Sequence, residues 1–469
     1  MVYSMNLDEN NIRAEEKGIV QIVSETNDGS NLNKASSRQY FFQIDVMKVL
    51  CIIFVVASHA DYGFTPFPIW DFIPPVQLFI IIMGFNQAYS FKRRNLHKLS
   101  ELYSYEYIKK IFWRFIFPLI LLNIICFLLD FMVFNITSYH VYGWSETELG
   151  VISWGETNRP PDSYTNVNFY FLLIGAPFLP GPGSYFIVLI IQFAIIFPLI
   201  YKLFVRNPFI GLISCYIIEL SFQLIANYIP FGGLHFLFSG CILRFISAVG
   251  LGVWFVNNHN LFAKQNLFVI ILTPLSIFLL LCSHNSLLNI FPASFFNPNI
   301  FEPMYYNPNN YGLTFFQNFP WWPNTNLFVY FYPALVFLIF MKILPSKLNE
   351  NKPLSQKTQI FFKSFSKVTY HILLVQGVFF MISIPLSSTY WDSIMIPEDI
   401  YGTIIEPITA GITDVNLLSF QRYISYMIAK IFFYIIIVAI VIVIALCFYV
   451  FESSIRKGCK KIGEQITRK

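Results

Sequence analysis

The sequence predicts an all-α integral membrane protein, a polytopic bundle of about ten transmembrane helices. Of its 469 residues, 56% are hydrophobic and only 12% are charged, whereas a soluble globular domain carries roughly 25% charged residues. The 53 phenylalanines add bulk that suits a surface in contact with lipid. The net charge of +5 comes from basic loops, and nothing in the pattern indicates nucleic acid.

Apolar segments long enough to cross a bilayer are readable at about ten places, since ~20 apolar residues span the hydrocarbon core. They lie near 43–63, 74–91, 111–134, 184–204, 208–229, 233–255, 266–288, 325–345, 367–389 and 422–451. The last segment is long enough to tilt or to begin at the membrane interface. A further apolar piece, 169–179, is too short to cross and is typical of an interfacial or re-entrant segment.

The chain divides into three regions. Residues 1–40 are polar, lack the apolar core of a signal peptide, and are expected to be a disordered cytoplasmic tail or a short amphipathic helix. Residues 41–452 form the transmembrane domain, and 453–469 form a basic cytoplasmic tail. The seven cysteines are scattered without CxxC spacing, so neither a metal site nor a disulfide framework is indicated.

Loop charges predict the orientation in the membrane. The connection 92–114 carries seven Lys or Arg residues against two Glu, and the stretches 346–367 and 452–469 are similarly basic. By contrast, 391–420 has five acidic residues and no Lys or Arg. Because Lys and Arg concentrate in cytoplasmic loops, we expect a multi-pass protein of the cell membrane with both termini in the cytoplasm.

The first apolar segment carries three ionisable side chains, Asp45, Lys48 and His59. Such groups are costly at membrane depth and mark a pathway or a site. The eleven-residue step from Lys48 to His59 is three helical turns plus ~20°, so both lie on one face, ~16 Å apart along the axis. Asp45 falls on the same stripe, where an ion pair with Lys48 is feasible. The pattern predicts a charged ligand at the membrane surface and proton chemistry deeper in.

The loops 135–182 and 289–324 are rich in Trp, Tyr, Asn, Pro and Gly. Aromatic, amide-rich surfaces of this kind suit stacking on sugar rings. The same composition is typical of an aromatic belt at the membrane interface with proline-punctuated loops. Both interpretations stand on the sequence alone.

The opening stretch resembles the first two helices of the membrane acyltransferase-3 family. Residues 44–59 (IDVMKVLCIIFVVASH) are similar to that family's (I/L)D-x-(L)-R followed by VV-x-x-H, with Lys48 where Arg is usual. Residues 76–85 (VQLFIIIMGF) resemble V-P-L-F-F-x-x-S-G-F, with Gln77 in place of Pro. The spacing from the basic residue to the histidine is kept.

Four later stretches resemble motifs of the same family. They are 107–118, the basic entry to the third helix with Lys109, Lys110 and Arg114; 184–198, beginning at Ser184-Tyr185; 244–252; and 366–376 (SKVTYHILLVQ). In the last, Gln376 stands where the family often has His, and Gln376 cannot act as a base. The resemblance therefore covers roughly residues 40–450.

The resemblance implies transfer of an acyl group, usually acetyl from acetyl-CoA, onto a hydroxyl of an envelope glycan or glycolipid. It gives His59 the central catalytic role and places Lys48 on the donor side. Coenzyme A carries several phosphates, and Lys109, Lys110 and Arg114 near Lys48 would form a cationic mouth for it. A neutral His in a low-dielectric channel can act as general base, with an acyl-imidazole intermediate as the variant mechanism.

The remaining candidate positions concern substrate contacts and helix packing. Gln77 and Tyr185 are candidate contacts of the substrate. Gly84, Gly250 and Gly252 are most simply positions where helices pack closely.

Two other classes of function remain open on the sequence. The protein could be an exporter or flippase of a polysaccharide or lipid-linked glycan, with Lys48 and His59 lining the path, although inverted repeats are not evident. It could also be a scaffold among envelope-polymer biosynthesis partners, or a homo-oligomer. The partners expected of the enzyme are acyl-CoA, a carbohydrate or glycolipid acceptor and the lipid bilayer.

Overall fold

The structure is a computed structural model of the chain. It describes residues 41–60, 74–137, 144–145, 151–152, 184–228, 241–282, 327–346, 352–386 and 415–467. The predicted tail 1–40, the apolar piece 169–179, the loop 289–324 and nearly all of 135–182 lie outside the described residues.

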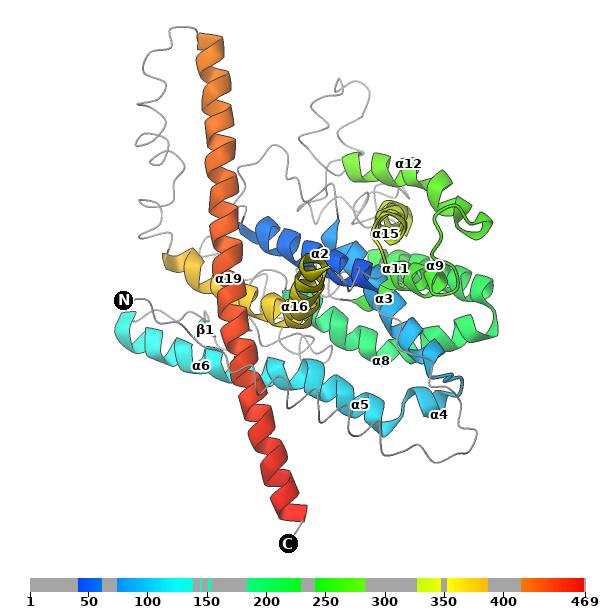
Figure 1. The fold of residues 1–469 in the computed structure, drawn as a ribbon, viewed down its shortest axis with the longest axis horizontal. Helices are drawn as coiled ribbons and strands as arrows, with labels where there is room; N and C mark the ends of the chain where they lie inside the picture. The colour runs from blue at the N-terminus through cyan, green and yellow to red at the C-terminus, as the bar shows by residue number, and fades with distance from the viewer. Residues whose placement is uncertain are drawn as a thin grey trace. The chain divides into compact units, whose positions relative to one another are not determined.

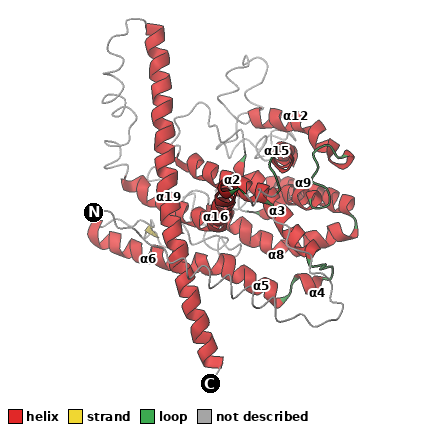
Figure 2. Cartoon of the chain, in the orientation of Figure 1, coloured by secondary structure: helices red, strands yellow, loops and turns green. Residues whose placement is uncertain are grey.

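The described part of the chain is helical, apart from two short strands (Figures 1 and 2). The helices are α2 (Phe42–Ala60), α3 (Pro75–Arg93), α4 (Leu99–Leu102), α5 (Tyr105–Ile111), the π-helix η2 (Phe112–Ile116), α6 (Phe117–Thr137), α8 (Ser184–Arg206), α9 (Pro208–Tyr228), η4 (Ile242–Phe245), α11 (Ile246–Phe255), η5 (Lys264–Asn266), α12 (Leu267–Cys282), η6 (Leu327–Tyr330), α15 (Phe331–Ile343), α16 (Pro353–Leu386) and α19 (Val415–Thr467). The strands β1 (Trp144–Ser145) and β2 (Val151–Ile152) pair antiparallel. The helical class predicted from the sequence is confirmed.

Two of the described helices are long and apolar enough to cross a membrane. They are Phe186–Arg206 within α8 and Tyr434–Cys459 within α19. A helix lies in each of the ten predicted segments, but the predicted count of about ten spanning helices is not confirmed. Among the described residues, the apolar helical runs Ile242–Phe255 and Phe328–Ile343 are shorter than the ~20 residues that a full crossing requires.

The helices α3 and α11 pack closely because glycines remove side chains between them. A Cβ atom added to Gly84 would lie 2.6 Å from the carbonyl oxygen of Val249, and one added to Gly252 would collide with the carbonyl oxygen of Ile81. A Cβ atom on Gly250 would lie 3.0 Å from Sγ of Cys215 on α9. The predicted close-packing role of these glycines is confirmed.

The start of α2 is hydrogen-bonded to the residues that follow α15. The backbone N–H of Phe42 donates to the carbonyl oxygen of Ser346 over 3.1 Å, and Nε2 of Gln43 donates to that of Leu344 over 3.0 Å. These bonds satisfy a helix N–H that has no partner within α2. They fix where the ionisable residues of α2 lie in the bundle. The helix α2 also packs against α16 and α19.

Candidate active site

The first turns of α2 hold a carboxylate and a cation in contact. Nζ of Lys48 lies 3.6 Å from Oδ1 of Asp45, and the hydroxyl of Ser366 on α16 donates to the same oxygen over 2.6 Å. A buried carboxylate needs such partners, since an unpaired charge is costly away from water. The predicted ion pair of Asp45 and Lys48 is confirmed, and Ser366 is a partner that spacing along α2 did not reveal.

His59 is the second-to-last residue of α2, and its backbone is helical. No break interrupts the helix between Lys48 and His59, so the two backbone positions share a face, ~16 Å apart along the axis. The side chain of His59 lies outside the described residues, as does that of Tyr185 on α8. Their roles stay predictions. Gln77 lies in the first turn of α3 and is half-buried.

The other predicted donor-side cations lie on α5 and η2. Lys109 and Lys110 are exposed on α5, where Nζ of Lys109 lies 5.8 Å from the ring centroid of Tyr105. Arg114 belongs to the π-helix η2, with its guanidinium carbon 5.2 Å from the ring centroid of Phe115. Single π-turns inside α-helices occur frequently at functional sites.

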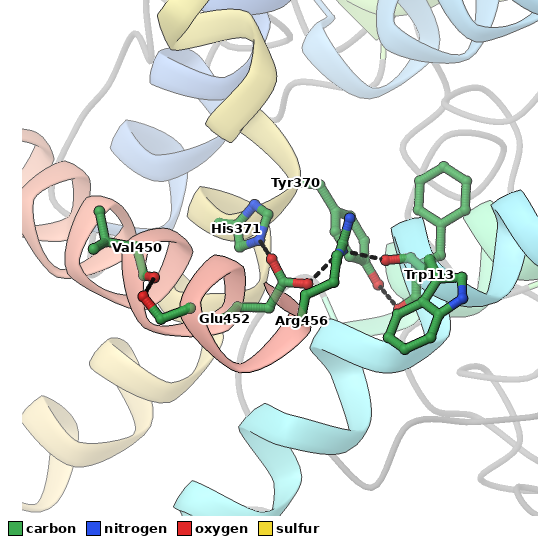
Figure 3. Close-up of polar contacts among 8 residues, drawn as sticks. Trp113, Tyr370, His371, Val450, Glu452 and Arg456 are labelled. Atoms are coloured by element: carbon green, nitrogen blue, oxygen red, sulfur yellow. Dashed lines mark hydrogen bonds and ion pairs between the residues drawn. The ribbon is translucent and has the colours of Figure 1, made fainter. Parts of the chain in front are cut away.

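A second polar cluster joins α16, α19 and η2 (Figure 3). Nε2 of His371 lies 3.6 Å from Oε2 of Glu452, and Arg456 forms an ion pair with the other oxygen of Glu452. Arg456 also donates to the carbonyl oxygen of Trp113 over 2.5 Å. The hydroxyl of Tyr370 donates to the carbonyl oxygen of Phe115 over 2.8 Å. Two backbone carbonyls of η2 are therefore held by side chains from two other helices.

One turn of α16 contacts the two elements that carry Lys48 and Arg114. Ser366 binds Asp45, the partner of Lys48, and Tyr370, one turn further on, binds the carbonyl next to Arg114. A four-residue step along a helix is a rise of ~6 Å. The structure thus brings the elements that carry Lys48 and Arg114 to the same short stretch of α16.

Sequence reasoning missed the pair of Glu452 and Arg456. Glu452 is the last residue of the predicted transmembrane domain, one position beyond the last predicted span, and Arg456 falls in the predicted basic tail. The signal was an acidic residue at the end of an apolar run, four positions before an Arg, a spacing that supports an ion pair on a helix. Gln376 is fully buried, and neither atom of its amide has a hydrogen-bond partner among the described residues.

The described part of the chain is helical, and two of its helices are long and apolar enough to cross a bilayer, which fits a membrane-embedded protein. Residues 41–452 match a family model described as an acyltransferase domain, so the chain belongs to the acyltransferase-3 family and is an acyltransferase. Members of this family are usually membrane-embedded, and their reaction needs an acyl donor and an acceptor. Searches among curated proteins and among solved structures gave no match.

Proposed function

We propose that the protein moves an acyl group, acetyl in the first place, from cytoplasmic acyl-CoA to a hydroxyl of an envelope glycan or glycolipid. The observation that carries this proposal is the arrangement on α2 in a chain of the acyltransferase-3 family. There, Lys48 is anchored by Asp45, and His59 follows on the same face of an unbroken helix.

The donor side is assigned to the cations around one turn of α16. Lys48 is held in place by its ion pair with Asp45, and its side chain keeps 20% of its surface exposed. Arg114 lies on η2, which Tyr370 and Arg456 hold from two sides. With Lys109 and Lys110, these residues supply positive charge and N–H donors for the phosphates of coenzyme A.

His59 is assigned as the general base. Its imidazole takes the proton of the acceptor hydroxyl while the oxygen attacks the thioester carbonyl. The carbon–sulfur bond then breaks, and the proton passes from the imidazolium to the departing thiolate. The products are the O-acyl ester and free coenzyme A. General-base assistance of this kind contributes roughly 10²–10⁴-fold to rate.

The proposal includes a multi-pass arrangement in the cell membrane, with both termini in the cytoplasm, because the basic loops then face inward. Gln77 and Tyr185 are proposed to contact the acceptor. Membership of an acyltransferase family does not favour the exporter alternative.

The test uses the full chain in nanodiscs with radiolabelled acetyl-CoA, following release of free coenzyme A. We expect slow turnover by the wild type and a loss of roughly 100-fold or more in His59→Ala, because the base is removed. His97→Ala is the matched control, since His97 is exposed on the loop after α3, and it should turn over like the wild type. Equal rates in all three proteins, or no binding of acetyl-CoA by any of them, would overturn the proposal.

A further inference from the structure

A pocket of about 320 Å³ lies on the loop between α11 and η5, apart from the residues assigned to the reaction. Its lining residues are Asn257, Asn258, His259, Asn260, Met341 and Lys342. Pockets of roughly 300–1,000 Å³ are typical of small-molecule sites.

The loop that forms the pocket is held rigid by one buried amide. Nδ2 of Asn266 donates to the carbonyl oxygens of Asn258 over 3.1 Å and of Asn260 over 2.7 Å. Oδ1 of Asn266 accepts from the indole N–H of Trp254 over 3.1 Å. A pocket whose backbone is already fixed pays little ordering entropy when a ligand binds.

The three pocket asparagines offer hydrogen-bond donors. Oδ1 of Asn257 accepts from Nζ of Lys92 over 3.1 Å, Oδ1 of Asn258 accepts from the backbone N–H of Asn260 over 3.0 Å, and Oδ1 of Asn260 accepts from that of Phe262 over 3.2 Å. Each side-chain oxygen is therefore engaged by the protein. The amides therefore present their N–H groups to a ligand, and these groups suit a hydrogen-bond acceptor such as an anion.

The charged residues of the described stretches that line and adjoin the pocket are all cations. Lys342 is exposed, with Nζ 3.8 Å from the ring centroid of Phe262, and Lys92 reaches the loop from the end of α3. The lining and neighbouring stretches 74–94, 241–282 and 327–346 contain no Asp or Glu. An excess of cations on these stretches raises the local concentration of anions.

The pocket lies beside the start of α2. The ring of His259 contacts those of Phe41 and Phe85, with centroids 5.9 and 6.2 Å away. The backbone just after Lys342 is bonded to Phe42 through Ser346. Lys48 is six residues beyond Phe42, a rise of ~9 Å along the helix.

We infer that this pocket binds a phosphate group, held by Lys342 and by the amide N–H groups of Asn258 and Asn260. Two sources carry that chemistry. One is the phosphorylated adenosine end of coenzyme A, and in that case the inference rests on the proposed function. The other is the headgroup of an anionic phospholipid, whose acyl chains would meet the exposed side chains of Phe262 and Ile343, 67% and 74% exposed.

The first arm of the test measures binding of radiolabelled adenosine 3′,5′-bisphosphate to the full chain in nanodiscs of neutral phosphatidylcholine. We expect Lys342→Gln to raise the Kd about tenfold or more, and Lys342→Arg to stay within about threefold of the wild type. Lys264→Gln is the matched control, because Lys264 is an exposed lysine of the adjacent η5 that does not line the pocket. We expect its Kd to change less than about twofold.

The second arm counts phosphatidylglycerol molecules retained by each protein from anionic nanodiscs, using native mass spectrometry. Weaker bisphosphate binding in Lys342→Gln assigns the pocket to the donor nucleotide. Loss of one retained phosphatidylglycerol with unchanged bisphosphate binding assigns it to lipid. No difference from Lys264→Gln in either arm overturns the inference. Both arms measure binding alone, so Lys342-dependent binding without acyl transfer would contradict only the proposed function.

Discussion

Asp45 and Glu452 are two buried carboxylates with the same kind of local ion pair, but the cations of the two pairs contact different parts of the protein. Each pairs with a cation one turn further along its own helix, Asp45 with Lys48 and Glu452 with Arg456. Each is also approached from α16, Asp45 by a hydroxyl donor and Glu452 by the ring of His371 (Figure 3).

The cations of the two pairs are used differently. Arg456 extends from Glu452 to the carbonyl oxygen of Trp113, so it connects α19 to η2. Lys48 lies in the first turns of α2, and the backbone position of His59 is on the same face of that helix. We interpret the Glu452 pair as a clamp that positions η2, and the Asp45 pair as part of the donor site. The predictions below separate these two roles.

The largest effect on stability is expected for Glu452→Ala. This change leaves His371 and Arg456 without their carboxylate, and breaking a buried pair costs roughly 3–5 kcal/mol. Since Arg456 is 42% exposed, water recovers part of this, and we expect about 2 kcal/mol. The measurement is the free energy of unfolding in detergent. Glu106→Ala, on the exposed face of α5, is the control and should leave the free energy of unfolding almost unchanged. Equal effects of the two changes would contradict the interpretation of the Glu452 pair as a clamp.

A smaller loss of stability with a larger loss of donor affinity is expected for Asp45→Asn. The amide keeps the shape of the side chain but removes the charge that orients Lys48. We expect a destabilisation of about 1 kcal/mol and a rise in the KM for acetyl-CoA. Steady-state kinetics and thermal unfolding of the same preparation check both. An unchanged KM would show that the Asp45 pair is structural, like the Glu452 pair.

Ser366→Ala sharpens the comparison further, because it removes one donor to Asp45 and leaves the ion pair intact. A single hydrogen bond of this kind contributes about 1 kcal/mol, and more when the acceptor is charged. The change should lower the Tm slightly and raise KM less than Asp45→Asn does. A larger kinetic effect than that of Asp45→Asn would mean that Ser366 contacts the donor itself.

The smallest effect is expected for the pH dependence of stability, through His259 on the pocket loop between α11 and η5. Burial among aromatic rings lowers the pKa of His259, and the nearby charge of Lys92 lowers it further. The unfolded chain therefore takes up a proton at this position at higher pH than the folded chain, so its contribution to stability is lost as pH falls below ~6.5.

We accordingly expect the Tm of the wild type to fall more between pH 7.5 and pH 5.5, flanking the ~6.5 pKa of free His, than that of His259→Gln. The exposed His97 supplies the control, since His97→Gln should follow the wild type. A wild type and a His259→Gln variant with parallel pH profiles would contradict the assignment.

The sequence predicted those features that local spacing controls. Hydrophobic composition gave the helical class, a three-residue step gave the pair of Asp45 and Lys48, and Gly84 and Gly252 marked the close approach of α3 and α11. Each depends on residues within a turn or two, or on the size of one side chain.

The remaining features depend on contacts between distant parts of the chain. The bond from Arg456 to the carbonyl of Trp113 joins residues 343 positions apart, and a backbone carbonyl leaves no mark in the sequence. The same holds for Ser366, which is 321 positions from Asp45. Arg456 was assigned to the basic tail because its charge fits a cytoplasmic loop as well as it fits a clamp.

The most direct test compares neutral substitutions of the two cations, Lys48→Gln and Arg456→Gln, in acetyl-CoA turnover and in thermal unfolding. If Lys48 binds the donor, Lys48→Gln should raise the KM for acetyl-CoA about tenfold. It should lower the Tm only modestly, because Ser366 still donates to the Asp45 carboxylate. Arg456→Gln should lower the Tm more than Lys48→Gln does. It should raise the KM of the folded protein less, because Tyr370 still holds η2 through the carbonyl of Phe115. A KM unchanged in Lys48→Gln, or raised equally in both variants, would contradict the assignment of the donor site to the first turns of α2.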